Sequence, residues 1–203
     1  MTTDTYLTIA NSSEGLFKEK GSKFNAYAFS VTNEEEIKIL LATLHKEHFS
    51  ARHICYAFRL GADKQTFRAH DAGEPTYTAG KPILGQIQSN DLTNILIVVV
   101  RYFGGTLLGV GGLINAYKQA AANALANASI IEKTINNVYE IKFDFQQMNE
   151  VMKIMKDENL EQIHRNFELN GNITFSVRKN NSKKVVELLS KISNLELSYL
   201  RTE

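Results

Sequence analysis

Two segments of the chain concentrate residue types that could bind an anion or perform acid–base chemistry. The first, residues 71–81, reads DAGEPTYTAGK and places two carboxylates, two threonine hydroxyls and a lysine in a polar stretch. Asp71 and Glu74 could share a proton or bind a hard cation. A turn at Gly73 and Pro75, with Asp71 and Thr78 capping backbone N–H groups, accounts for the same residues equally well.

The second segment is a glycine-rich turn after an apolar run. Residues 95–100 are apolar and mostly β-branched, which predicts a central strand that ends at Arg101. A helix should begin near Leu113, and a strand, a turn with free N–H groups and a helix N-terminus together permit an anion site. The positions predicted to form the buried helical stripe are Ile114, Tyr117, Ala121, Ala124, Leu125 and Ala128.

This turn matches neither common phosphate-binding motif. Its glycines do not complete the G-x-G-x-x-G spacing, and Gly80-Lys81, the one Gly-Lys pair, is followed by Pro82 where a P-loop has Ser or Thr. Tight packing of an alanine-rich helix on the strand is therefore as good an explanation of the glycines as an anion seat beside Arg101.

Basic residues on several segments could form a local RNA or phosphate patch if the sheet gathers them, with Tyr77, Tyr102 and Phe103 as stacking surfaces. Pairing of the arginines with acids is the competing interpretation. The residues predicted to bind an anion or RNA are His53, Arg59, Arg68, Lys81, Arg101, Gly104, Gly105, Gly111 and Gly112. The loop residues predicted to belong with them are Asp71, Gly73, Glu74, Pro75, Thr78 and Gly80.

The sequence predicts no metal site, because its histidines and its single cysteine do not have the spacing of three or four converging ligands. Cys55 is expected to be a buried apolar thiol. Alternation in residues 53–60 puts His53, Cys55 and Arg59 on one face of a strand, which we interpret as the exposed face. The other face of the strand should then point toward the core. We predict no cofactor and no catalytic residue.

Composition limits the classes of function. The chain has 203 residues, 43% of them hydrophobic, with 23 basic and 22 acidic side chains, so its net charge gives no general attraction to nucleic acid or membrane. No signal-like or membrane-spanning stretch is evident, and one cysteine fits a reducing compartment. A cytoplasmic location without membrane association is the expectation.

The remaining elements follow from periodicity. Residues 6–9 and 24–31 read as opening antiparallel strands, and Asn33 should cap a helix with Glu34, Glu35 and Glu36 in its first turn and a stripe of Ile37, Leu40, Leu41 and Leu44. A short strand is expected at 66–68, and a helix through Ile83, Leu84 and Ile87 should end near Asn90. Polar residues 132–137 are interpreted as a linker.

The C-terminal part predicts the element order βαββαβ. Strands are expected at 138–145 and 195–200, a hairpin at 163–169 and 173–177 around Asn170-Gly171, and two helices at Met148–Met155 and Val185–Ile192. The chain is then predicted to form two domains, an N-terminal domain of residues 1–134 and a C-terminal domain of residues 135–203.

Three blocks in order, ARHICYAFRLG, DAGEPTYTAGKPIL and VVVRYFGGTLLGVGGLINAYKQA, resemble the signature blocks of the IMPACT/YigZ family. The resemblance implies an α+β protein whose N-terminal domain is a ribosomal protein S5 domain 2-like α/β sandwich, and whose C-terminal domain is ferredoxin-like and similar to those at the end of elongation factor G. The family's acidic block usually reads D-D-G-E-P-S-G-T-A-G, so Ala72, Thr76 and Tyr77 depart from it. Loss of the second Asp weakens a paired-carboxylate mechanism.

Eukaryotic members of that family are translation regulators that carry an added RWD domain, which these 203 residues have no room for. The resemblance therefore implies a translation-linked regulatory or binding protein, with RNA or ribosomal components as partners, and brings no catalytic residues. Two alternatives stay open: an enzyme acting on a phosphorylated or nucleotide-like small molecule, and a protein-interaction module. Oligomeric state is not predicted.

Overall fold

A computed structural model describes residues 4–167 and 170–203, and these form two compact units. The N-terminal unit is Tyr6–Lys133, and the C-terminal unit combines Asp4 and Thr5 with Thr134–Glu203. Each unit has its own β-sheet and its own buried core, so the architecture is α+β. Within the described ranges, no helix is both long enough and apolar enough to cross a bilayer.

The N-terminal unit is built on a five-stranded sheet in which every neighbouring pair is antiparallel. In order across the sheet the strands are β2 (Ser13–Glu19), β3 (Ser22–Ser30), β6 (Ile95–Tyr102), β4 (His53–Leu60) and β5 (Thr66–His70). The apolar run predicted as a central strand is confirmed in β6, whose residues from Ile95 to Val100 are fully buried. The strand continues through Arg101 to Tyr102, so the prediction that Arg101 ends it was wrong.

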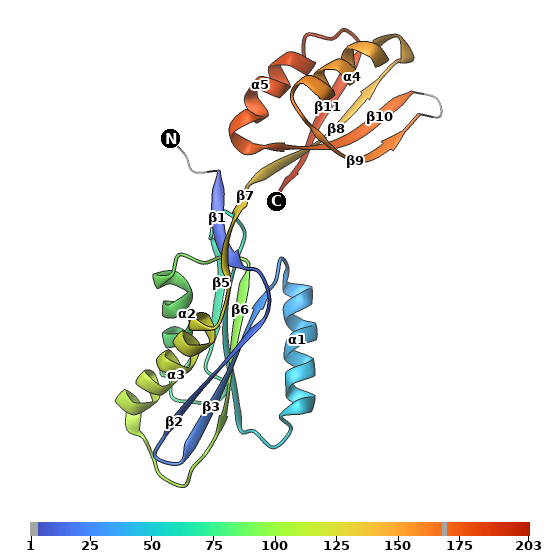
Figure 1. Ribbon diagram of the computed structural model, residues 1–203. Coiled ribbons are helices and arrows are strands. Elements are labelled where there is room, and N and C mark those ends of the chain that lie inside the picture. The colour runs from blue at the N-terminus through green and yellow to red at the C-terminus, as the bar shows by residue number, and fades with distance from the viewer. Residues whose placement is uncertain (1–3, 168–169) are drawn as a thin grey trace. The chain divides into compact units, whose positions relative to one another are not determined.

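Helices cover both faces of this sheet (Figure 1). The helices α2 (Gly80–Ser89) and α3 (Gly109–Ala126) lie on one side, and α1 (Glu34–Glu47) lies on the other. The expectation that only one face of β4 meets the core was therefore wrong, because Cys55 packs under α2 and α3 while Phe58 packs under α1.

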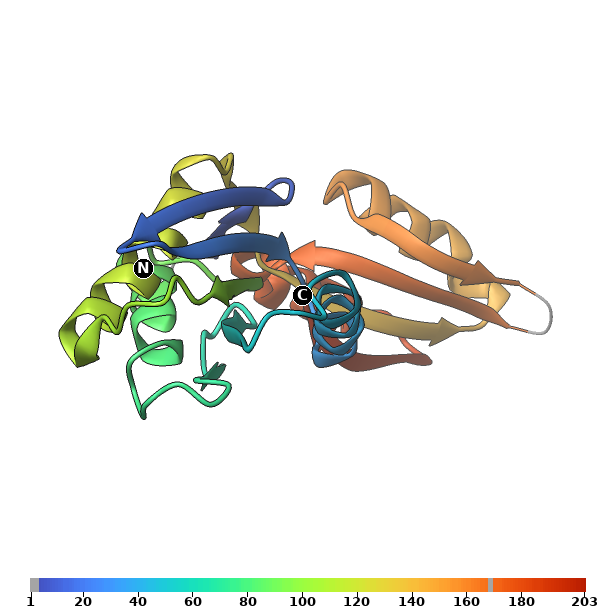
Figure 2. The same ribbon diagram turned by 90° about the horizontal axis from the view of Figure 1, so that it is seen from below.

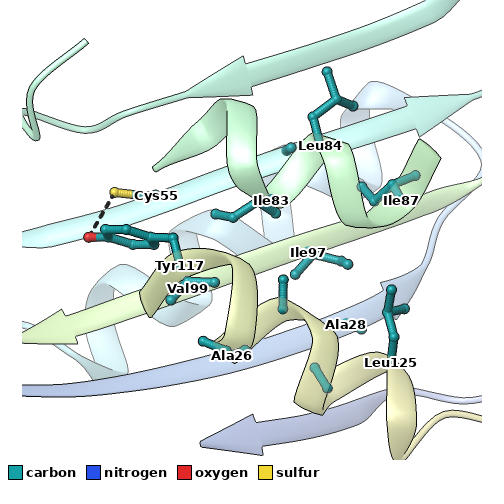
Figure 3. Packing of buried hydrophobic residues seen from close by; sticks show 14 of the residues in the cluster. Ala26, Ala28, Cys55, Ile83, Leu84, Ile87, Ile97, Val99, Tyr117 and Leu125 are labelled. Carbon is teal, nitrogen blue, oxygen red and sulfur yellow. Dashed lines mark hydrogen bonds between the residues drawn. The ribbon is translucent and has the colours of Figure 1, made fainter. Parts of the chain in front are cut away.

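The helix predictions are largely confirmed. Asn33 caps α1 by accepting the Glu36 backbone N–H at 3.0 Å, with the three glutamates in the first turn. The helix α3 begins four residues before the predicted Leu113, and Leu113 faces the core while Ile114 is exposed. In Figure 3, α2 contributes Ile83, Leu84 and Ile87 to the core above the sheet, and α3 contributes Tyr117 and Leu125.

The segment interpreted as a linker is strand. Residues 132–134 belong to β7 (Ile130–Thr134) and residues 136–137 to β8 (Asn136–Phe143). The strand β7 pairs with β1 (Thr5–Ile9) in a separate two-stranded sheet, so β1 does not pair with β3. Four of the five β7 residues are exposed, which is why their polar composition resembled a linker.

The C-terminal unit has the predicted order βαββαβ, in a four-stranded sheet ordered β11-β8-β10-β9. Its remaining elements are α4 (Met148–Asp157), β9 (Glu161–Asn166), β10 (Gly171–Arg178), α5 (Lys179–Leu189) and β11 (Leu195–Thr202), with a 3-10 turn at Phe145–Gln147. Figure 2 shows β9 and β10 running side by side, and α4 and α5 pack on the sheet in one core. Residues 168 and 169 of the predicted hairpin lie outside the described residues.

Candidate functional site

The centre of the site is a buried ion pair between the central strand and the loop after β5. Arg101 lies near the end of β6, between Phe24 of β3 and His53 of β4 in the strand register. Its Nη1 donates to Oε1 of Glu74 at 2.6 Å. Both residues are more than nine-tenths buried, with Arg101 6% and Glu74 8% exposed. A carboxylate and a guanidinium removed from water in this way stabilise each other, and removal of either one is costly.

Tyr117 of α3 completes the coordination of that carboxylate oxygen. Its hydroxyl donates to Glu74 Oε1 at 2.7 Å. The Cys55 thiol lies 3.4 Å from the Tyr117 hydroxyl (Figure 3) and 3.0 Å from the Asp71 carbonyl oxygen, two acceptors for its one hydrogen. Burial raises the pKa of Cys55 to about 12 and raises the pKa of Tyr117 above its usual range. Both groups are therefore neutral donors near pH 7, and the expectation of a buried, apolar Cys55 is confirmed.

Asp71 organises the loop rather than pairing with Glu74. Its Oδ1 accepts the backbone N–H groups of Ala79 and Gly80 at 3.0 and 2.8 Å, and its Oδ2 accepts that of Tyr77 at 2.9 Å. The two bonds to Oδ1 satisfy the N–H groups of Ala79 and Gly80 at the start of α2. The predicted capping by Asp71 is thus present, whereas the Thr78 hydroxyl donates to the Pro75 carbonyl oxygen at 2.7 Å instead of capping an N–H group.

Left-handed backbone shapes the same loop. Gly73 has φ +83°, and two of the three positions that depart from the family block, Ala72 and Tyr77, have φ +45° and +66°. Gly80 must be small, because a Cβ there would lie 2.5 Å from the His70 backbone nitrogen. The loop is thus held by backbone geometry and by Asp71, and it places Glu74 facing Arg101.

Hydrogen-bonding capacity remains at this buried pair. Both bonds to Glu74 use Oε1, and among residues 4–167 and 170–203 no group donates to Oε2. Over the same ranges no group accepts a hydrogen bond from the buried Arg101 Nε. The guanidinium packs by its faces instead, 5.5 Å from the Phe24 ring centroid and 5.6 Å from that of Phe103. Oε2 therefore keeps the capacity to accept a hydrogen bond from a ligand, whereas Nε is a buried donor without an acceptor.

The ion pair lies on the wall of a cavity of about 480 Å³, which we call the Arg101 cavity. Its polar lining comprises Arg52, His53, Glu74 and Arg101, and its apolar lining comprises Pro75, Phe103, Leu107, Leu108, Val110 and Leu113, with Gly73 and Gly109. The apolar side includes residues that protrude into solvent, since Leu107 is 82%, Val110 60% and Phe103 52% exposed. Apolar walls with a few convergent polar groups are typical of ligand pockets.

The sheet brings only some of the predicted basic residues to this cavity. His53 lines it, is half-buried and donates from Nδ1 to the Ala72 carbonyl oxygen at 2.9 Å, so its placement on an exposed face beside Arg59 was wrong. Arg59 pairs with Ile95, at the other end of β6 from Arg101, and its guanidinium contacts the Leu92 carbonyl oxygen and Asp91. Arg68 and Lys81 are exposed and do not line the cavity; Lys81 lies over the Tyr77 ring, 5.1 Å from its centroid.

Several glycines of the turn have structural explanations. The Gly104 backbone N–H donates to Ser22 Oγ at 3.1 Å, and a Cβ at Gly104 would clash with Gly21. Gly105 has φ +85°, Gly112 packs on Leu108, and a Cβ at Gly111 would meet open space. The residues that sequence reasoning missed are the aliphatic members of the lining, Leu107, Leu108 and Val110. Their signal is the presence of large apolar side chains in a glycine-rich turn, where polar residues are usual.

Comparison with known proteins assigns the family. The model of the Impact N-terminal domain matches residues 20–125, which include the loop, β6 and nearly all of α3. The chain belongs to the IMPACT family. The family resemblance expected from the three sequence blocks is thus confirmed.

Relatives extend the similarity beyond that domain. An IMPACT family member of Haemophilus influenzae is 32% identical over 173 residues, covering 84% of this chain and 82% of its own. IMPACT family member YigZ of Escherichia coli is 36% identical over 138 residues, 67% of this chain and 68% of its own. The crystal structure of a hypothetical protein superposes with a TM-score of 0.76 at 28% identity, covering 98% of both chains.

Proposed function

We propose that this IMPACT family protein is a translation-linked regulatory protein that acts by binding RNA, free or within the ribosome, through the Arg101 cavity. Family membership supports the link to translation, because the eukaryotic members that the sequence resembles are translation regulators. The observation that carries the proposal is the cavity itself, where a buried guanidinium lies beside the exposed Arg52, the half-buried His53 and an exposed aromatic ring. Stacking surfaces next to positive charge are what single-stranded RNA requires.

Charge determines which atoms would contact phosphate. The Arg101 charge is balanced by Glu74 at 2.6 Å, so a phosphate placed on Arg101 would also lie near a carboxylate. Arg52 has no ion pair among the described residues and lies at the cavity's edge. We therefore assign the phosphate contact to Arg52 and His53, with Arg101 contributing within the cavity.

A salt titration tests this proposal. Binding of single-stranded RNA should weaken as salt rises, and Arg52→Ala should weaken it about 3-fold or more and make the salt slope shallower by about 1. Arg68→Ala is the matched control, because it also removes one exposed positive charge from the N-terminal unit but lies away from the cavity. Equal losses in both variants, or no binding to RNA or ribosomes at low salt, would refute the proposed site.

The fold assignments implied by the family are proposed on the same basis. The antiparallel order β2-β3-β6-β4-β5 with helices on both faces supports an S5 domain 2-like fold for the N-terminal unit, Tyr6–Lys133. The order β11-β8-β10-β9 with two helices supports a ferredoxin-like domain over residues 135–203.

An enzyme acting on a nucleotide-like molecule is the second candidate, because a cavity of about 480 Å³ is within the usual range for small-molecule sites. Its chemistry would have to use Glu74, since the Asp71 carboxylate is occupied by three backbone N–H groups. Metabolite screening with Glu74→Gln as the control tests it. Turnover that is absent, or that survives in the variant, excludes this mechanism.

A further inference from the structure

The buried pair at the cavity wall is better suited to a neutral group than to an anion. Arg101 and Glu74 together carry no net charge, and both are more than nine-tenths buried. A bare phosphate in contact with this wall would gain from the guanidinium but lose to the carboxylate at similar distance. A neutral group that donates a hydrogen bond to the carboxylate would add no net charge to this wall.

The atom that remains available defines that group further. Among residues 4–167 and 170–203 no group donates to Glu74 Oε2, which can accept from a ligand in the cavity, whereas Arg101 Nε is itself buried. Every nucleobase carries an N–H donor on its hydrogen-bonding edge, so any of the four can donate to this oxygen.

The walls and the edge of the cavity favour the same ligand. Phe103 holds the Arg101 guanidinium 5.6 Å from its ring centroid and is still 52% exposed, which leaves ring surface for stacking. Leu107 and Val110 offer apolar surface to the faces of a flat ring. Arg52 and His53 lie where a phosphate joined to that ring through a sugar could reach positive charge.

From this arrangement we infer that the Arg101 cavity takes one unpaired nucleobase, with Glu74 on its hydrogen-bonding edge, Phe103 against its face and Arg52 on the attached phosphate. This inference rests on the proposed function and names the chemical group of the RNA that the cavity would bind. The same chemistry could come from a free nucleotide or from a base in single-stranded RNA, and the two sources are separable by experiment.

Calorimetric titration of the full chain with AMP, GMP, CMP, UMP and ribose 5-phosphate tests the inference. Nucleotides should bind about tenfold or more tightly than ribose 5-phosphate, because stacking and the edge contacts are lost without the base. Phe103→Ala should abolish most of that difference. Phe145→Ala, which removes a ring of 50% exposure in the C-terminal unit, should leave it unchanged. Equal affinity for ribose 5-phosphate, no binding of any nucleotide, or no effect of Phe103→Ala would overturn the inference.

A second arm uses a hexamer of single-stranded RNA and the duplex of the same sequence. Preference for the single strand that Phe103→Ala removes supports both the inference and the proposed function. If the single strand and the duplex bind equally and Phe103→Ala has no effect on either, the inference of a nucleobase site is overturned. The proposed function of RNA binding is then retained. Nucleotide binding without binding of either RNA keeps the inference, with free nucleotides as the source, and overturns the proposed function.

Discussion

At the scale of residues, the Glu74 carboxylate is held from two elements that are distant in sequence. Arg101 reaches it from the central strand and Tyr117 from α3, at 2.6 and 2.7 Å. The loop that carries Glu74 is thereby fixed to both layers of the N-terminal unit, which keeps Oε2 in place for a ligand.

Tyr117→Phe should lower the free energy of unfolding of the N-terminal unit by about 2 kcal/mol, because a buried hydrogen bond to a carboxylate is lost. Urea unfolding followed by circular dichroism measures this. Tyr77→Phe provides the control, since Tyr77 is 65% exposed and its change should stay below about 0.5 kcal/mol. Equal stability of the two variants would contradict a supporting role for the Tyr117 hydroxyl.

The Cys55 thiol predicts a specific pH dependence. Its pKa is raised from 9.0 to about 12, first by burial, so the unfolded chain loses this proton at lower pH than the folded chain does. The stabilisation is complete below pH 9 and is lost as pH rises from 9 toward 12, at about 1.4 kcal/mol per unit. Unfolding measured at pH 8 and pH 10 should show a smaller decrease in Cys55→Ala than in the natural chain. Equal decreases would contradict burial of the thiol.

Residue types and their spacing identified part of this site. Asp71, Glu74 and Arg101 are predictable as site residues, because two carboxylates in a polar segment and a cation next to a glycine-rich stretch are residue types that bind ions or act as acids and bases. The Glu74–Tyr117 contact joins residues 43 positions apart, and only the packing of α3 on the sheet reveals it. Likewise, alternation showed that Arg59 shares a strand face with His53, but the sheet register was needed to place Arg59 at the opposite end.

At the scale of elements, glycines determine how closely α3 approaches the sheet. A Cβ at Gly15 of β2 would lie 2.3 Å from the Ala124 backbone nitrogen, so helix and strand touch with no side chain between them. The alanine-rich face of α3 permits the same proximity to β3 and β6.

Two glycine substitutions should therefore change stability in opposite directions. Gly15→Ala should destabilise the N-terminal unit by about 1–3 kcal/mol, because α3 must move away from β2. Gly85→Ala in α2 has no atom within 4 Å of its new Cβ and should stabilise by about 0.5–1 kcal/mol. Thermal unfolding of both variants tests the packing, and a stabilised Gly15→Ala would show that the contact is loose.

Elements with strong periodicity were predictable, and elements exposed to solvent were not. The apolar stripe of α1 reflects burial of one helix face, and the apolar run of β6 reflects burial of both strand faces. The strands β2 and β7 were missed because most of their side chains are partly or fully exposed, so their sequences lack the apolar alternation of a half-buried strand.

At the scale of the whole molecule, the chain divides into two compact units, and the C-terminal unit includes a segment from the start of the sequence. Asp4 accepts hydrogen bonds from Arg178 Nε and Nη2 at 2.6 and 3.0 Å, and its backbone oxygen accepts the Ile135 N–H. The bond from Arg178 lowers the pKa of Asp4 below 3.8, so its stabilisation is present at neutral pH and is lost as pH falls below that value.

Asp4→Ala should therefore loosen the C-terminal unit selectively. Hydrogen exchange should become faster for amides of β8 and β10 near the paired residues Asn136 and Arg178, because the carboxylate no longer holds the Arg178 guanidinium. Amides of β6 belong to the other core and should keep their protection. Faster exchange in β6 alone would contradict the assignment of Asp4 to the C-terminal unit.

The central claim is that the Arg101 cavity binds RNA, and the most direct measurement is a titration of the isotope-labelled 22.8 kDa chain with single-stranded RNA, followed by amide chemical shifts. The largest shifts should cluster at Gly73, Glu74 and residues 103–110, with little change in β5. The absence of shifts at saturating RNA, or shifts centred on the C-terminal unit, would contradict it.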